Sequence, residues 1–169
     1  QLSVNLPYNI AENYFNNSLV QEASGLGDVS ALLLYQVHNT MSGADTDFRQ
    51  RFSVGGGVKL PTGNYKMILD DEPVQPEYQP GTGSIDFLVN AQYIMRFKNW
   101  GGTANALYQL NGENNLGYAV ANGFTGAAPV FYQWQTGEQT VIMPEVGLFH
   151  EFAERDTENG VHVFGTGGS

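Results

Sequence analysis

Polar and apolar side chains alternate without a break between residues 85 and 97. The odd-numbered positions carry Ile, Phe, Val, Ala, Tyr, Met and Phe, and the even-numbered ones carry Asp, Leu, Asn, Gln, Ile and Arg. Because successive side chains of a strand point to opposite faces, this period of two predicts a β-strand with one continuous apolar face. The pattern leaves open whether that face contacts a protein core or membrane lipid.

Similar alternation recurs along the chain and is interrupted by clusters of Gly, Pro and Asn. Helical periodicity fits none of these segments as well, so the pattern predicts an all-β protein of about seven or eight strands. We predict strands at 2–10, 29–37, 48–60, 84–97, 103–111, 118–136, 141–152 and 161–164, where 118–136 is either two short strands or one strand broken at 126–129. Residues 11–27 are interpreted as a loop or as a loop that contains a short helix. Residues 39–47 are interpreted as a loop, and 98–102 as a hairpin turn.

The longest predicted connection is residues 61–82, which contain four prolines and therefore cannot form a central strand. A structureless connection of this length inside a compact domain is commonly functional. We therefore expect this loop to gate the lumen or cavity that the domain encloses. The 169 residues are otherwise consistent with one domain.

Composition narrows the class of protein. The formal net charge is −10 with only seven Lys and Arg residues, which disfavours a nucleic-acid partner. Cysteine is absent, so disulfides and thiol chemistry are excluded. The 21 glycines, the 12% aromatic residues and the low 14% charged fraction suit all-β proteins, including membrane barrels. No apolar run is long enough for a transmembrane helix. The residues after Gln1 do not form a basic-then-apolar leader, so we expect any secretion signal to have been removed or to lie upstream.

Strand length and aromatic placement favour lipid as the solvent of the apolar faces. Several predicted strands exceed the usual globular length of about five or six residues and match the ~9–11 that span a membrane. Aromatic residues gather near predicted strand ends, as they do at lipid–water boundaries. These two groups are Tyr93, Phe97 and Trp100, and Phe131, Tyr132 and Trp134. The alternative is that these aromatics fill the core of a soluble β-sandwich.

Four stretches, "SGLGDVSALLLYQ", "FSVGGGVKLPTGNY", "PEYQPGTGSIDFLVNAQYIMRF" and "ANALYQLNGENNLGYAVANGF", resemble the glycine-rich signatures of bacterial outer-membrane β-barrels. The resemblance is to the phenol meta-pathway transporter family and covers roughly residues 25–150. It implies an antiparallel up-and-down transmembrane barrel that passes small, often aromatic or hydrophobic, compounds. The C-terminal "VFGTGGS" departs from the usual aromatic closing strand, and the predicted strands are fewer than the family pattern. We therefore expect the barrel to be incomplete as given, a part of something longer.

Candidate site residues follow from the polar rows of the predicted strands. Arg49, Arg51 and Lys59 share one strand face, from which they could oppose Asp86, Glu145 and Glu151 across a lumen. Such a charged constriction would filter solutes, whereas the alternative is charge balance that only stabilises a polar barrel interior. The expected lumen-lining set is Arg49, Arg51, Lys59, Asp86, Asn90, Arg96, Glu145 and Glu151. The expected lipid-facing set is Phe87, Val89, Tyr93, Met95 and Phe97.

The sequence contains no pattern typical of catalysis or of a bound cofactor. The carboxylates at positions 70–72 and Glu77 lack the ligand spacing of a calcium loop and are interpreted as a solvated loop tip. His38, His150 and His162 lack metal-ligand spacing, and no nucleophile elbow or phosphate loop occurs. We expect neither an enzyme, a metal site nor a cofactor.

The hypothesis is thus a channel or transporter of the bacterial outer membrane, with lipid, a small solute and other envelope proteins as partners. Two alternatives remain open. One is a structural barrel subunit of a larger envelope complex that transports nothing. The other is a soluble β-sandwich that binds carbohydrate through Trp100, Tyr108 and Trp134.

Overall fold

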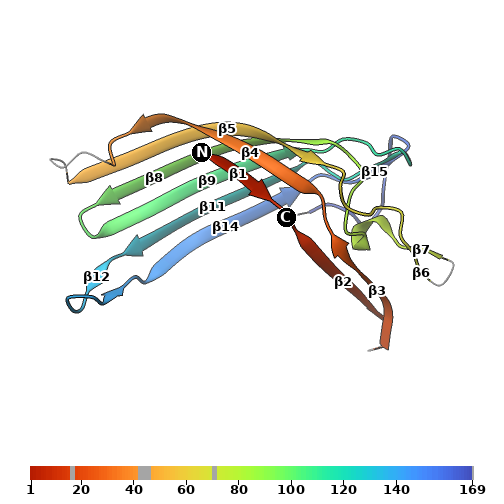
Figure 1. The fold of residues 1–169 in the computed structure, drawn as a ribbon, viewed down its shortest axis with the longest axis horizontal. Helices are drawn as coiled ribbons and strands as arrows, with labels where there is room; N and C mark the ends of the chain where they lie inside the picture. Colours follow the sequence, from red (N-terminus) through yellow and green to blue (C-terminus); the bar gives the residue numbers. More distant parts are fainter. Residues whose placement is uncertain (16–17, 42–46, 70–71, 169) are drawn as a thin grey trace.

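The protein is an all-β chain of antiparallel sheets, as the alternation predicted. The computed structural model describes residues 1–15, 18–41, 47–69 and 72–168. Its seven-stranded main sheet runs lengthwise through the molecule (Figure 1). In spatial order the strands are β1 (Leu2–Asn5), β4 (Val29–Asn39), β5 (Phe48–Leu60), β8 (Asp86–Phe97), β9 (Trp100–Leu110), β11 (Gly123–Tyr132) and β14 (Glu145–Ala153).

The remaining elements are short, except for one hairpin. β2 (Tyr8–Phe15) and β3 (Ser18–Leu26) pair with each other and project away from the main sheet (Figure 1). The 61–85 connection contains β6 (Ile68–Leu69), β7 (Glu72–Pro73) and the 3₁₀ turn η1 (Pro76–Tyr78). The others are β10 (Tyr118–Ala119), β12 (Trp134–Gln135), β13 (Val141–Ile142), β15 (Thr157–Glu158) and β16 (Val161–His162). Among the described residues, no helix is long and apolar enough to cross a membrane.

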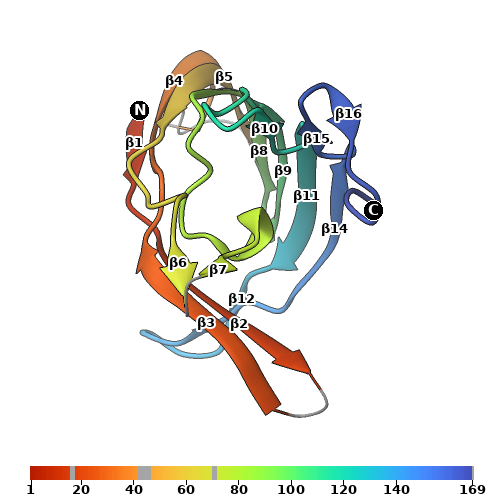
Figure 2. The same ribbon diagram turned by 90° about the vertical axis from the view of Figure 1, so that its right-hand side faces the viewer.

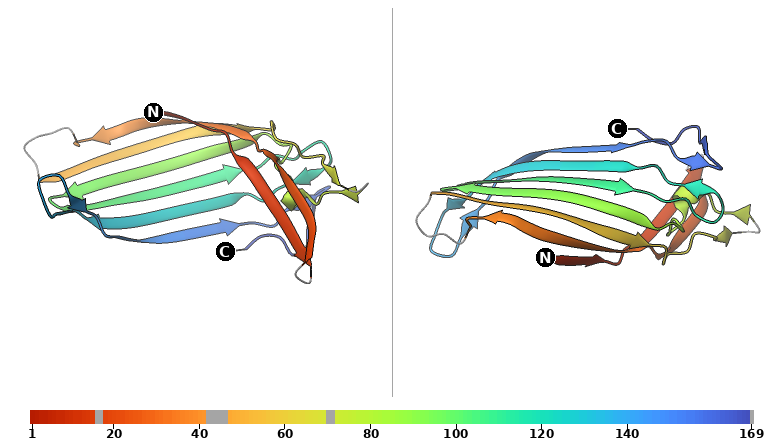
Figure 3. Two further views of the ribbon diagram at one scale, coloured as in Figure 1. Left: turned by 60° about the horizontal axis from the view of Figure 1, so that its bottom comes forward. Right: turned by 90° about the horizontal axis from the view of Figure 1, so that it is seen from above.

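The main sheet curls into an open arc, with the 61–85 connection inside its curve (Figure 2). β1 and β14 form the two edges of this sheet and do not pair with each other. The two further views show the long strands side by side along the whole arc (Figure 3). The described strands therefore form an antiparallel meander without closing into a barrel.

β4 and β5 approach each other closely at two glycines of β5. A β-carbon on Gly55 would lie 2.0 Å from the carbonyl oxygen of Leu33, and one on Gly57 would lie 2.2 Å from that of Ala31. Any side chain at these two positions would therefore push β4 and β5 apart. Glycines this dense in a strand indicate a bend, a bulge or close backbone approach. Of these three, the structure shows close backbone approach at Gly55 and Gly57.

Strand register divides the side chains of the main sheet between a convex and a concave face. Phe87 of β8 stands opposite Val58 of β5 and Leu110 of β9, so the apolar positions of neighbouring strands share a face. This convex face is exposed: Phe87 is 57% and Val89 53% accessible. Polar positions share the concave face, where Asp86 pairs with Lys59 in register.

Polar side chains make up a large share of the buried residues in the described part of the chain. The buried residues with polar or charged side chains are Asp28, Ser53, Ser84, Asp86 and Asn90. The buried hydrophobic residues are Ala23, Val74, Leu88 and Ala121. Burial in a soluble globular domain involves mainly apolar side chains, since burial of apolar surface is what stabilises it.

Several element predictions were wrong in detail. Residues 11–27 are not a loop, because β2 and β3 cover most of them in a paired hairpin. The predicted 2–10 strand is divided before β2 at Leu6 and Pro7, where proline removes a backbone donor. The predicted turn at 98–102 is only two residues long, because β9 already begins at Trp100. β11 continues unbroken through residues 126–129.

Candidate functional site on the concave face

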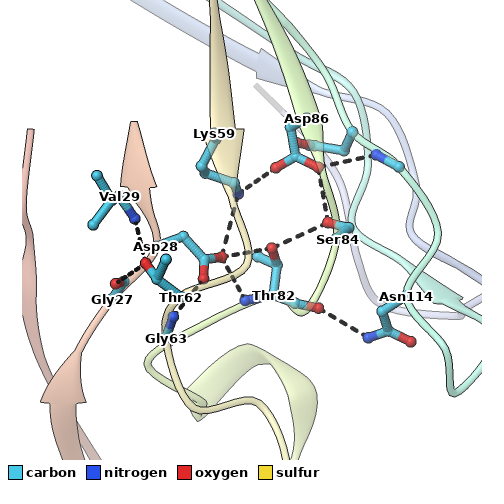
Figure 4. Close-up of polar contacts among 12 residues, drawn as sticks. Gly27, Asp28, Val29, Lys59, Thr62, Gly63, Thr82, Ser84, Asp86 and Asn114 are labelled. Atoms are coloured by element: carbon cyan, nitrogen blue, oxygen red, sulfur yellow. Dashed lines mark hydrogen bonds and ion pairs between the residues drawn. The ribbon is translucent and has the colours of Figure 1, made fainter. Parts of the chain in front are cut away.

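A buried ion-pair cluster lies at the end of the main sheet where the long connections emerge (Figure 4). Lys59 of β5 stands opposite Asp86 of β8, and its Nζ forms a close ion pair with Asp86 Oδ2. The same Nζ lies 3.9 Å from Asp28 Oδ2, at the start of β4. The side chains of Lys59, Asp28 and Asp86 are 15%, 4% and 0% exposed. One cation therefore serves two buried carboxylates.

Asp28 ties both ends of the 61–85 connection to the sheet. Its Oδ1 accepts a hydrogen bond from the Gly63 backbone N–H at 2.9 Å. Its Oδ2 accepts two hydrogen bonds from Thr82, from the N–H at 2.8 Å and from the hydroxyl at 2.7 Å. Thr62 adds a further link, since the Val29 N–H donates to its hydroxyl at 2.8 Å. The connection is thereby held inside the arc.

Asp86 is satisfied by groups from three segments. Its Oδ1 accepts from the Ser84 hydroxyl at 2.8 Å and from the Gly112 N–H at 3.0 Å. Its Oδ2 accepts from Gln109 Nε2 at 3.3 Å, in addition to the Lys59 contact. Every ionised oxygen is therefore compensated, which is the condition for burying a carboxylate.

Three chain segments cross next to this cluster at glycines. A β-carbon on Gly63 would lie 2.8 Å from Gly81 Cα and 2.9 Å from the Gly27 carbonyl carbon. One on Gly81 would lie 2.6 Å from the Gly63 carbonyl carbon. These obstacles are backbone atoms that cannot move aside easily. Close approach at the crossing therefore requires glycine.

A cavity of about 510 Å³ adjoins the cluster inside the arc. Polar groups of Asn9, Lys59 and Gln109 line it together with apolar side chains such as Leu88 and Leu107. Asn9 of the projecting hairpin donates to the Pro80 carbonyl oxygen at 2.8 Å, which joins that hairpin to the inner connection. A cavity of this size and mixed lining can hold a small molecule.

Arg49, Arg51 and Arg96 lie at the opposite end of the same face. Arg49 and Arg96 are directly paired across β5 and β8, and Arg51 is two residues further along β5. Among the described residues, none of the three forms an ion pair. Arg96 donates a hydrogen bond to Gln133 Oε1. The structure therefore separates these arginines from Lys59, with which the sequence had grouped them.

The other expected lumen-lining residues also share the concave face. Asn90 is buried and donates to Asn105 Oδ1 and to the Ala106 carbonyl oxygen, both at 3.1 Å. Glu145 and Glu151 stand on the edge strand β14, in register with Phe131 and Thr125. Both glutamates are exposed and form no ion pair within the described part of the chain. Of the expected charge oppositions, the described part of the chain contains an ion pair only between Lys59 and Asp86.

All five residues expected to face lipid lie on the convex face. Each pairs with an even-numbered residue of β5 between Phe48 and Val58, and these positions point to the same face. Phe97 belongs to a row of aromatic residues that crosses four strands. In order across β5, β8, β9 and β11 this row is Phe48, Phe97, Trp100 and Tyr132. The rings of Trp100 and Tyr132 meet edge-to-face with centroids 5.0 Å apart.

The two aromatic groups that the sequence placed at separate strand ends thus meet at one end of the sheet. Phe131 differs from its neighbour Tyr132, because register places it on the concave face.

Asp70 and Asp71 of the acidic loop lie outside the described residues. Within the described part, no group of three or more His, Cys, Asp or Glu side chains is arranged to hold a metal ion.

Sequence reasoning missed the partners that complete the ion-pair cluster, above all Asp28, Thr82 and Ser84. A signal for them was present: "GLGD", "KLPTG" and "QPGTGS" supply Gly27–Asp28, Lys59 with Gly63, and Gly81 to Ser84. The three motifs contact one another around Lys59 (Figure 4). Comparison of the chain with protein-family models, curated proteins and solved structures found no match.

Proposed function

We propose that this chain forms part of the wall of a bacterial outer-membrane β-barrel that passes small, apolar or aromatic solutes. The observation that carries the proposal is the exposed apolar convex face. It spans the main sheet and includes side chains from its edges to its centre, such as Leu2, Leu33, Phe87, Val130 and Leu148. An exposed apolar surface of this extent marks contact with lipid or with a partner.

Strand dimensions support lipid as the contact. β4, β5, β8, β9, β11 and β14 contain 11, 13, 12, 11, 10 and 9 residues. A tilted strand needs about 9–11 residues to cross a bilayer. The aromatic row from Phe48 to Tyr132 lies where an interfacial girdle would be, at one end of these strands.

The concave face would line the aqueous interior of such a barrel. Its buried polar residues and the cavity beside Lys59 are suited to a solute path. The 61–85 connection lies within the arc, fastened by Asp28, and would narrow this path. The proposed role of the connection is therefore a constriction whose width sets the size of solute admitted.

The open edges of the sheet set a condition on this proposal. Unpaired backbone groups of β1 and β14 would be costly in lipid, where no water can hydrogen-bond to them. Further strands must pair with both edges, from the same protein or from another envelope protein. A structural barrel without transport satisfies the same condition and is the second candidate.

The carbohydrate-binding sandwich is less well supported. A sandwich needs a second sheet over the apolar face of the first. No described element covers Phe87 or Val89, which remain more than half exposed. The three aromatics proposed as sugar platforms also lie apart: Trp100 and Tyr108 are on the convex face of β9, and Trp134 is in the β12–β13 hairpin.

Spin labelling tests the membrane contact directly, because the chain contains no native cysteine. Single-cysteine variants Val89→Cys and Thr103→Cys place labels on the convex and concave faces of adjacent strands. After reconstitution in lipid vesicles, the Val89 label should relax with lipid-soluble oxygen, and the Thr103 label with a water-soluble nickel chelate. Nickel access to the Val89 label would refute the membrane assignment. Vesicles that contain the inserted protein but admit a small aromatic solute no faster than protein-free vesicles would favour the structural barrel.

A further inference from the structure

The arginine end of the concave face carries an unusual concentration of positive charge. Arg49 and Arg96 occupy directly opposed positions on β5 and β8, and Arg51 occupies the next concave position of β5. All three are half-buried. Like charges directly opposite one another destabilise a sheet, so this arrangement is unfavourable when nothing neutralises it.

No carboxylate neutralises these guanidinium groups within the described residues. The ion pairs there involve only Lys59 and Lys98. Glu145 shares the cross-strand row of Arg96, but β9 and β11 lie between them. At the other end of the concave face, in contrast, Lys59 already forms ion pairs with two carboxylates. An anion would therefore be attracted to the arginines and not to Lys59.

An aromatic ring lies beside this charge. The row that contains Arg96 continues to Gly101 on β9 and Phe131 on β11. A β-carbon on Gly101 would lie 2.2 Å from Cζ of Phe131, so the ring extends over Gly101 toward Arg96. Ile94 stands opposite Arg51 on the same face. Two half-buried apolar side chains thus border the arginines on a face that is otherwise mainly polar.

We propose that Arg49, Arg51, Arg96, Phe131 and Ile94 form a binding site for small aromatic carboxylates. The carboxylate accepts hydrogen bonds from the guanidinium groups, whose planar geometry matches its two oxygens. The ring of the ligand packs against Phe131 and Ile94. This inference builds on the proposed function by naming the solute class, and the site would select solutes at this end of the path.

The test measures binding of benzoate to the full chain folded in detergent micelles, with neutral benzamide as the matched ligand. Titration calorimetry should detect benzoate binding that weakens about tenfold or more in Arg49→Gln/Arg51→Gln, since hydrogen bonds to charged groups contribute that much. Lys98→Gln, which removes an exposed lysine near the same strand end, should bind benzoate like the wild type. Equal affinity for benzoate and benzamide would overturn the proposal, as would unchanged benzoate binding in the arginine variant.

Stability provides a second readout that a purely structural role would not reproduce. Removing mutually repelling arginines should raise the urea midpoint of the unliganded protein, whereas arginines that only hold the fold together would lower it on removal. Benzoate should raise the midpoint of the wild type and leave that of the variant unchanged. A lower midpoint in Arg51→Gln alone would refute the site.

Failure of this site and failure of the membrane proposal are distinguishable. Benzoate binding in micelles combined with nickel access to the Val89 label would refute the barrel and support the site. Lipid contact at Val89 without benzoate binding would support the barrel and refute the site.

Discussion

Lys59 and Asp86 stand opposite each other on β5 and β8 and form an ion pair, in which the Asp86 side chain is fully buried. Asp28, the residue before β4, approaches the same ammonium group. Its carboxylate also accepts a hydrogen bond from the Gly63 backbone N–H, which holds the connection inside the arc. Three parts of the sequence are thereby coupled through one lysine.

Asp86→Asn should destabilise the protein by about 3 kcal/mol, because removal of one partner leaves a largely buried charge under-compensated. Urea unfolding followed by the fluorescence of Trp100 and Trp134 measures the change. The control is Asp47→Asn, which breaks the exposed 3.7 Å pair with Lys98 and should cost about 0.5 kcal/mol or less. Similar costs for the two variants would contradict the structural importance of the buried pair.

Asp28→Ala should release the 61–85 connection from the sheet. The amide protons of Gly63 and Thr82 lose their acceptor, so hydrogen–deuterium exchange in peptides spanning residues 61–85 should accelerate. Asn64→Ala is the control, because the described hydrogen bond of that side chain is a local one to the Lys66 N–H. Unaltered exchange in Asp28→Ala would show that other contacts hold the connection.

Gly63→Ala should destabilise the protein by about 1–3 kcal/mol through overpacking at the crossing of three backbones. Thermal or urea unfolding measures the effect. Gly137→Ala is the matched control, since its added β-carbon would meet nothing closer than 3.8 Å. If both variants have the stability of the wild type, the backbones at Gly27, Gly63 and Gly81 are not in the close contact described.

Val89→Arg should impair insertion into lipid vesicles, because a charge on a lipid-facing strand position costs about 2–4 kcal/mol near the bilayer centre. Thr125→Arg adds the same charge on the concave face, opposite Glu151, and should insert normally. Heat-modifiable gel migration and protease protection report the inserted fraction. Equal insertion of both variants would show that the convex face does not contact lipid.

Trp100 should reside at the lipid–water boundary if the aromatic row is an interfacial girdle. In the variant Trp134→Phe, Trp100 is the single tryptophan, and lipids brominated near the headgroup should quench it more than lipids brominated near the chain ends. The reciprocal variant Trp100→Phe reports on the β12–β13 hairpin. Stronger quenching of Trp100 by deep bromines would place the row inside the hydrocarbon region.

Local pattern was sufficient for long strands such as β5 and β8 because their two faces differ in polarity at most positions. Residues 48–60 and 85–97 illustrate this, since β5 and most of β8 coincide with their alternation. The β2–β3 hairpin lacks such a contrast and was taken for a loop. Residues 11–27 show no sustained alternation, so the hydrophobic pattern carries no signal for the antiparallel pairing of β2 with β3.

The amino-acid sequence by itself determined the strand class, the two-faced character of the sheet and the membership of each face, because side-chain orientation in a strand depends only on position. It also placed glycine where backbones cross. Tertiary structure alone decided which charges meet. Arg49 and Lys59 share one face of one strand, yet they lie at opposite ends of it, with different neighbours. Carboxylates from distant segments reach only the lysine, because chain folding and not local periodicity brings Asp28 and Asp86 together.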